Sequence, residues 1–185
     1  MIGSLQTWLW GQWSRYGLTI ALITFVLDQA HKWWMILGYR IAEKGRVTIT
    51  PFLDLVYVLN RGVSYGMFTQ GDQRGQYVLA SFAVVASLGL AVWLARGVDN
   101  KILAASVGLI IGGALGNGLD RILLGGVADF FSAHAFGYYW YVFNVADVAI
   151  VAGVVGLLYD SFVSSRPNNS AGNSRDGSGD ASKLS

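Results

Sequence analysis

Four apolar runs, each about as long as a membrane-spanning helix, dominate this sequence of 185 residues. A helix needs roughly 20 apolar residues to cross about 30 Å of hydrocarbon. Hydrophobic residues make up 54% of the chain and charged residues only 13%, a smaller charged share than soluble domains carry. The sequence therefore predicts an all-α polytopic membrane protein with four transmembrane helices, at about residues 16–37, 77–95, 102–119 and 141–163.

The connection between the first two runs, at about residues 38–75, has a different composition. It is rich in Val, Ile, Thr, Leu and Tyr and contains the turn-like Thr50-Pro51, which predicts a few short strands. We expect a small β platform here, outside the hydrocarbon. Residues 1–166 would then form a single membrane domain, and the polar, Ser-rich residues 167–185 are predicted to be a disordered tail.

Two further patterns are typical of membrane helices. The aromatic run at residues 138–141, like the tryptophans near the N-terminus, is typical of a belt at the membrane interface. Gly108, Gly112 and Gly116 recur at four-residue spacing, which predicts a surface where two helices pack closely.

Several kinds of chemistry are excluded by the absence of cysteine and the presence of only two histidines, His31 and His134. No thiol nucleophile or disulfide can form, and a multi-histidine metal site lacks ligands. We therefore expect no metal and no cofactor, and we place both histidines at the membrane interface. The net charge is only +2 and no basic block is interleaved with aromatic residues, so the sequence favours lipid over nucleic acid as a partner.

Polar residues gather at one end of the predicted bundle. If the helices alternate in direction, the end of the first, the end of the third and the start of the fourth meet on the platform side. An Asp at the centre of a bilayer costs about 2.5 to 3.5 kcal/mol, so such residues usually face the bundle interior, pair with another residue or serve a function. The residues that meet at this end are Asp28, Lys32, Asn60, Asn117, Asp120, Arg121, Asp129, Asn144 and Asp147.

The charged residues in this cluster have structural as well as chemical interpretations. Asp28 and Lys32, four residues apart on one helix face, form either a buried ion pair or part of a reactive site. Asp120 beside Arg121 leaves the same choice, because the planar guanidinium of Arg121 also suits peptide carbonyls. Asp147 has no basic neighbour in the sequence and lies at membrane depth, so it is the best candidate for a catalytic residue.

Five short blocks resemble, in order, the lipoprotein signal peptidases, also called signal peptidase II. The blocks are residues 28–32 (DQAHK), 60–66 (NRGVSYG), 116–121 (GNGLDR), 127–130 (VADF) and 143–147 (FNVAD). No block is specific alone, but five in one order, together with four spans, cover most of the chain. Ser64 and Tyr65 stand where the family usually has Ala and Phe, and the tail lies outside the resemblance.

This resemblance implies a membrane aspartyl endopeptidase of the bacterial inner membrane, with four spans, both termini cytoplasmic, and the platform and active site near the periplasmic face. It implies cleavage of diacylglyceryl-modified prolipoproteins just before the lipid-modified cysteine, by a dyad that falls on Asp129 and Asp147. The residues implied around the substrate or a globomycin-type inhibitor are Asn60, Gly62, Asn117, Arg121 and Asn144, with Asp28, Lys32 and Asp120 as polar support. The charges do not fix the orientation independently, because six basic residues fall on each predicted side when Lys32 is left aside.

Other classes of membrane protein fit the sequence less well. A proton-coupled transporter, the main alternative, also places acids within helices, but a conduction path needs polar groups in both halves of the bundle. A serine protease of the Gly-x-Ser-x-Gly type lacks its motif, and residues 116–120 have one residue too many for a Gly-x-Gly-Asp protease. A purely structural four-helix scaffold leaves the convergent polar cluster unexplained.

Overall fold

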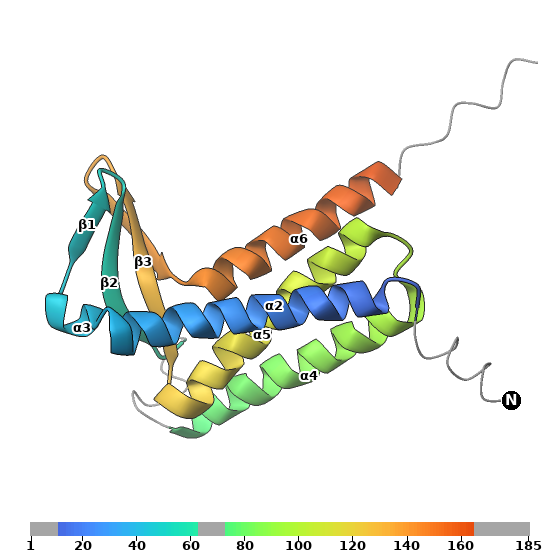
Figure 1. Ribbon diagram of the computed structural model, residues 1–185, viewed down its shortest axis with the longest axis horizontal. Coiled ribbons are helices and arrows are strands. Elements are labelled where there is room, and N and C mark those ends of the chain that lie inside the picture. Colours follow the sequence, from blue (N-terminus) through green and yellow to red (C-terminus); the bar gives the residue numbers. More distant parts are fainter. Residues whose placement is uncertain (1–10, 63–72, 165–185) are drawn as a thin grey trace, which may run out of the picture.

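The computed structural model describes residues 11–62 and 73–164. Within these residues four long helices are present, and they run alongside one another with a small sheet at one end of the bundle (Figure 1). The predicted tail, Ser64 and Tyr65 lie outside the described residues. The elements are α2 (Ser14–Trp33), a π-helical turn (Trp34–Gly38), α3 (Ile41–Lys44), β1 (Val47–Thr50), β2 (Leu53–Asn60), α4 (Gln73–Gly97), α5 (Lys101–Leu124), β3 (Val127–Ala135), β4 (Tyr138–Phe143) and α6 (Val145–Ser164).

Three helices among the described residues, α4, α5 and α6, are long and apolar enough to cross a membrane. The membrane character of the chain is thereby confirmed, and the count of four spans stays a prediction. Helix α2 has 20 residues, which corresponds to about 30 Å, but its last turns carry three buried polar side chains. Asp28, Gln29 and Lys32 lower the mean hydropathy of α2 because they are polar. They are buried and face the bundle instead of lipid.

The sheet confirms the predicted β platform in part, since β1 and β2 lie within the predicted residues 38–75 and the protein is otherwise mostly helical. Its four antiparallel strands have the order β1-β2-β3-β4, so half of it comes from the chain between α5 and α6. The fourth span was predicted from residue 141, but residues 138–143 form β4 and the helix begins at Val145. An apolar run rich in Tyr, Val, Phe and Trp suits a strand as well as a membrane helix, and hydropathy alone does not separate the two.

Helix α5 is the centre of the bundle and packs against α2, α4 and α6. Its glycines allow close approach: a Cβ at Gly112 would lie 2.7 Å from the Thr24 Cβ of α2, and one at Gly113 would lie 2.6 Å from the Ala146 carbonyl oxygen of α6. Gly108 likewise faces the backbone of α2 at Gly17. The prediction that these glycines form a helix-packing surface is confirmed.

The sheet is fixed to the end of the bundle through β3. In the antiparallel pairing of β2 with β3, Val58 lies opposite Asp129 and Asn60 lies opposite Val127. Ala128 and Phe130, the neighbours of Asp129 in β3, are fully buried in an apolar cluster with Met35 from the π-helical turn that follows α2. This packing places Asp129 where the sheet meets the helices.

Candidate active site

Asp147 is positioned by the start of α6. Asn144 precedes this helix, and its side-chain Oδ1 accepts the Asp147 backbone N–H at 3.0 Å. In return, the Asp147 Oδ2 accepts the Asn144 backbone N–H at 3.1 Å. Two such reciprocal bonds form a capping box, which satisfies backbone donors that the first helical turn leaves free. The position of the Asp147 carboxylate is therefore fixed by the local physics of a helix start.

Asp129 approaches the same place from β3, and its side chain is almost completely buried. One carboxylate oxygen accepts the Asn144 Nδ2–H at 2.6 Å, and the other accepts the Asn60 Nδ2–H at 3.1 Å. Asn144 thus contacts both aspartates, through its side-chain Nδ2 to Asp129 and through the capping box to Asp147.

Asn117 of α5 completes the connection between the two aspartates. Its Nδ2 donates to the Asp147 Oδ1 at 2.8 Å, and its Oδ1 accepts the Asn144 Nδ2–H at 3.1 Å. Three amides from β2, α5 and the start of α6 therefore hold the two carboxylates in one hydrogen-bonded network. The aspartates and asparagines singled out in the sequence meet here, although Asn60 and Asn144 are 84 residues apart in the numbering.

A buried ion cluster lies behind this network. The Lys32 Nζ is 2.8 Å from the Asp28 Oδ2 and 2.8 Å from the Asp120 Oδ2. The two acids also reach backbone donors: the Asp28 Oδ1 accepts the Ala146 N–H at 2.9 Å, and the Asp120 Oδ2 accepts the Ala128 N–H at 3.1 Å. Ala146 precedes Asp147 and Ala128 precedes Asp129, so the cluster holds the backbone beside each aspartate.

Gly62 and Arg121 reach this region in different ways. The Gly62 N–H donates to the Asn60 Oδ1 at 3.0 Å, in a turn with a φ of +78° that favours glycine. This bond directs the other end of the Asn60 amide toward Asp129. The Arg121 Nη1 donates to the Asn117 carbonyl oxygen of its own helix at 2.9 Å, and its charge acts on both aspartates.

The sequence did not identify Gln29 as part of the polar support. Its Nε2 donates to the Asp120 Oδ1 at 3.0 Å and to the Gly116 carbonyl oxygen at 3.2 Å. The available signal was a third buried polar residue between Asp28 and Lys32. The two histidines, by contrast, do not join the network: His31 stacks on Phe131, and His134 lies beside Asp54 on the sheet.

Burial controls the protonation of Asp129, which lies in the sheet outside the membrane-spanning helices. Loss of water raises its pKa from the ordinary 3.8 to about 6, while the N–H donors of Asn144 and Asn60 oppose this rise. The negative charge of Asp147 contributes a further upward shift. Two neighbouring carboxyls of this kind tend to share one proton, as in a general acid–base pair.

An open cavity of about 350 Å³ lies beside Asp147 on α6. Its other lining residues are apolar: Phe143, Val148, Val151 and Ala152. Val148 and Val151 are more than half exposed, which places the cavity on the lipid-facing side of the helix. Within the described part of the chain, no group of three or more His, Cys, Asp or Glu side chains is arranged to hold a metal.

Comparison with known proteins identifies the family. The sequence pattern of the family described as signal peptidase (SPase) II matches residues 20–163, which include both aspartates and their supporting residues. This chain belongs to the signal peptidase II family. Membership separates the peptidase from the transporter and scaffold alternatives, because the family consists of membrane aspartyl proteases.

Relatives and solved structures agree with this assignment. A lipoprotein signal peptidase of Rhodopseudomonas palustris (strain TIE-1) is 48% identical over 153 residues, covering 80% of this chain and 93% of the relative. One of Methylorubrum extorquens (strain PA1) is 49% identical over 147 residues, covering 80% and 85%. A bacterial membrane enzyme solved by the in meso method at 1.9 Å resolution is 26% identical, with a TM-score of 0.64 over 79% of this chain and 92% of that one.

Proposed function

We propose that this signal peptidase II removes the signal peptide from diacylglyceryl-modified prolipoproteins, cutting just before the lipid-modified cysteine, with Asp129 and Asp147 as the catalytic dyad. The observation that carries the proposal is the joining of these two carboxylates by three amides beside an apolar cavity. Such a site offers paired carboxyls for hydrolysis and a lipid-facing surface for an acylated substrate.

The mechanism needs one carboxyl that is ionised and one that carries a proton. We assign the proton to Asp129, because burial raises its pKa to about 6, so that a larger share of this carboxyl is protonated than of an ordinary Asp and the share grows as the pH falls toward 6. Asp147 takes a proton from water as the water attacks the scissile carbonyl, while Asp129 gives its proton to the carbonyl oxygen. Collapse of the tetrahedral intermediate breaks the C–N bond as one of its two hydroxyls returns its proton to Asp129 and the proton on Asp147 passes to the leaving amine. Water thus supplies the hydroxyl of the new carboxyl group and a proton of the new amine.

The apolar cavity on α6 suits lateral entry of the substrate from the bilayer. Asp147 lines it together with apolar side chains, so a lipid-anchored chain can reach the carboxylate without leaving an apolar surface. Asn60, Gly62, Asn117 and Asn144 orient the dyad, and Arg121 is the residue we assign to a substrate carbonyl because its Nε is buried and has no hydrogen-bond partner among the described residues. An inhibitor of the globomycin type would occupy the same place.

The pH dependence of cleavage should change when the hydrogen bond from Asn60 to Asp129 is removed. Replacing Asn60 by Ala removes an N–H donor that stabilises the ionised carboxylate, so the pKa of Asp129 rises further above about 6. Because Asp129 must be protonated, the alkaline limb of the profile of kcat/KM against pH should move to higher pH. Asn100→Ala is the matched control, since Asn100 donates to Asp160 in a similar pair at the opposite end of the bundle. An unmoved or lowered limb in Asn60→Ala would contradict the assignment.

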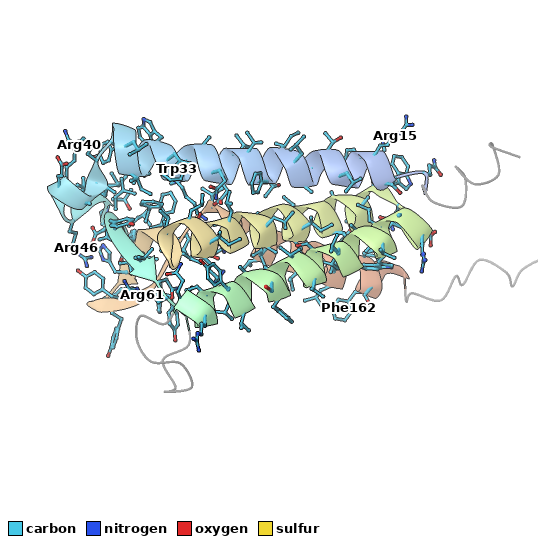
Figure 2. The ribbon with its side chains drawn as sticks, turned by 90° about the horizontal axis from the view of Figure 1, so that it is seen from below. Arg15, Trp33, Arg40, Arg46, Arg61 and Phe162 are labelled. Carbon is cyan, nitrogen blue, oxygen red and sulfur yellow. The ribbon has the colours of Figure 1, made fainter. Side chains whose placement is uncertain are left out.

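We further propose four spans with both termini in the cytoplasm and the sheet on the periplasmic side. Figure 2 places Arg40 and Arg46 at the sheet end and Arg15 at the opposite end. The chain has no cysteine, so single introduced cysteines can report the two sides. Phe136, 96% exposed between β3 and β4, and Gly97, at the end of α4 with open space around it, are suitable positions.

In intact bacteria, a membrane-impermeant maleimide should label Phe136→Cys and should label Gly97→Cys only after the membrane is permeabilised. The physical reason is that the two positions lie at opposite ends of helices that cross the bilayer. The reverse pattern would place the sheet in the cytoplasm, and labelling of both in intact cells would contradict the proposed topology.

The experiment that tests the proposed function is a cleavage assay in which purified protein in detergent and lipid receives a diacylglyceryl-modified prolipoprotein. Release of the signal peptide, seen as a gel shift and abolished by globomycin, is the expected result. The same precursor without the diacylglyceryl group is the matched control and should stay intact. A folded protein that leaves several modified precursors uncut would refute the proposal.

A further inference from the structure

Lys32 is buried at the centre of the ion cluster. One side chain, that of Asn117, connects it by hydrogen bonds to Asp147 of the dyad. Its side chain is 2% exposed, and its ammonium contacts three oxygens: the Asp28 Oδ2 and the Asp120 Oδ2, both at 2.8 Å, and the Asn117 Oδ1 at 2.9 Å. An ammonium has three N–H donors and no acceptor, so these contacts use its full hydrogen-bonding capacity. The two acids account for its charge. The contact with Asn117 needs a separate explanation.

That contact decides which end of the Asn117 amide faces Asp147. The oxygen and nitrogen of an amide have nearly the same shape, and only hydrogen bonding distinguishes the two orientations. With the Oδ1 accepting from Lys32 and from Asn144, the Nδ2 is directed to the Asp147 Oδ1 at 2.8 Å. A reversed amide would set N–H donors against the ammonium of Lys32 and an oxygen against the carboxylate of Asp147. Both reversed contacts are repulsive.

We propose that Lys32 is a positioning residue for the hydrolysis, which acts through Asn117 by fixing the orientation of the amide that holds Asp147. This inference rests on the proposed function, in which Asp147 takes a proton from water. Lys32 itself contacts neither aspartate of the dyad in any hydrogen bond or ion pair of the described residues. Its contact route to the dyad therefore passes through Asn117, and this route is separable from a role in folding. The charge of Lys32 also lowers the pKa of Asp129 through space, an effect that shifts the pH profile of cleavage and does not depend on Asn117.

The test removes the ammonium without leaving an additional unpaired charge. Lys32, Asp28 and Asp120 together carry a net charge of −1, and Lys32→Met/Asp120→Asn keeps that value, as does Lys32→Met/Asp28→Asn. The wild type, which has the same net charge, is the reference for each pair, and the single Asp→Asn variant, which retains the lysine, measures the loss that the missing carboxylate causes alone. In either pair, kcat for a diacylglyceryl-modified peptide should fall at least about 10-fold below its reference, while KM stays within twofold, because the substrate does not contact Lys32.

A double-mutant cycle with Asn117→Ala then distinguishes positioning from general stabilisation. If Lys32 acts through Asn117, the loss from Lys32→Met should disappear once Asn117 is Ala, so that the two losses do not add. A merely structural lysine would lower activity by the same factor in both backgrounds. Melting temperatures measured in the same detergent show whether each variant is folded.

The outcomes separate this inference from the proposed function. A wild-type protein that does not cleave refutes the proposed function itself. If the wild type cleaves, the positioning role is overturned by an unchanged kcat in the Lys32 pairs, by losses that add in the cycle, or by failure of both pairs to fold, which would make Lys32 a residue of the fold alone. A fall in kcat with non-additive losses supports it.

Discussion

Asp147→Asn is expected to reduce cleavage of a diacylglyceryl-modified prolipoprotein by at least about 10³-fold, within the range for loss of a general base. The amide cannot take a proton from water. It keeps an oxygen that can accept the Asn144 backbone N–H, which the Asp147 Oδ2 accepts at 3.1 Å in the present protein. The start of α6 should therefore remain capped, and the loss should reflect chemistry instead of unfolding.

The matched control for this variant lies on the same helix. Asp160 accepts the Asn100 Nδ2–H at 2.8 Å near the far end of α6, in a bond of the same kind as that between Asp147 and Asn117. Asp160→Asn should cleave at close to the wild-type rate. The measurement is the rate of the gel shift, with melting temperature as a check of folding. Wild-type turnover by a folded Asp147→Asn would exclude Asp147 from the chemistry.

Asp129→Asn should lose cleavage to a similar extent for a different reason. The carboxyl would be replaced by an amide that cannot give up a proton to the carbonyl oxygen of the substrate, and the Asn144 Nδ2–H, 2.6 Å from the Asp129 Oδ1, would face an amide in place of a carboxyl group. The same gel-shift assay measures the loss. A folded Asp129→Asn that retained turnover would leave Asp147 acting alone and would contradict the dyad.

The polar residues of this site could be predicted from the sequence, because the cost of placing charged side chains in apolar helices depends only on the local sequence. Buried Asp and Lys residues within apolar runs are costly, so Asp28, Lys32 and Asp147 could be assigned to a bundle interior from their positions alone. Alternation of helix direction then predicted that they meet Asn117 and Asp120 at one end. The identity of the dyad came from the resemblance to signal peptidase II, and its catalytic role awaits experiment.

The sheet was less accessible, because pairing of strands depends on residues far apart in the chain. β2 pairs with β3 over a separation that includes two membrane helices, and a single residue, Asn144, separates β4 from α6. The predicted fourth span therefore begins four residues before α6, at the last three residues of β4 and Asn144. The side-chain hydrogen bond between Asn60 and Asp129 depends on the register of β2 against β3, and it could not be derived from either segment alone.

The reciprocal cap at α6 explains how one residue can serve both the fold and the dyad. Asn144 is fully buried and fixes the helix start through the Asp147 N–H, while its Nδ2 reaches Asp129 and Asn117. These two roles have different chemical requirements. A short hydroxyl can cap a helix, but it cannot extend to either partner of the Nδ2.

Asn144→Ser and Asn144→Ala should therefore both reduce cleavage by about 100-fold or more, because each leaves Asp129 without its shorter hydrogen bond and removes one of the two donors to the Asn117 Oδ1. Their stabilities should differ. Ser retains an oxygen that caps α6, whereas Ala loses the cap at a cost of roughly 0.5 to 2 kcal/mol, so the melting temperature should fall further in Asn144→Ala. Cleavage rates and melting temperatures of the two variants, measured in one detergent, check both parts. If Asn144→Ser cleaved like the wild type and only Asn144→Ala were impaired, Asn144 would contribute to catalysis through the helix cap alone, and the side-chain bridge between the aspartates would have no role in the reaction.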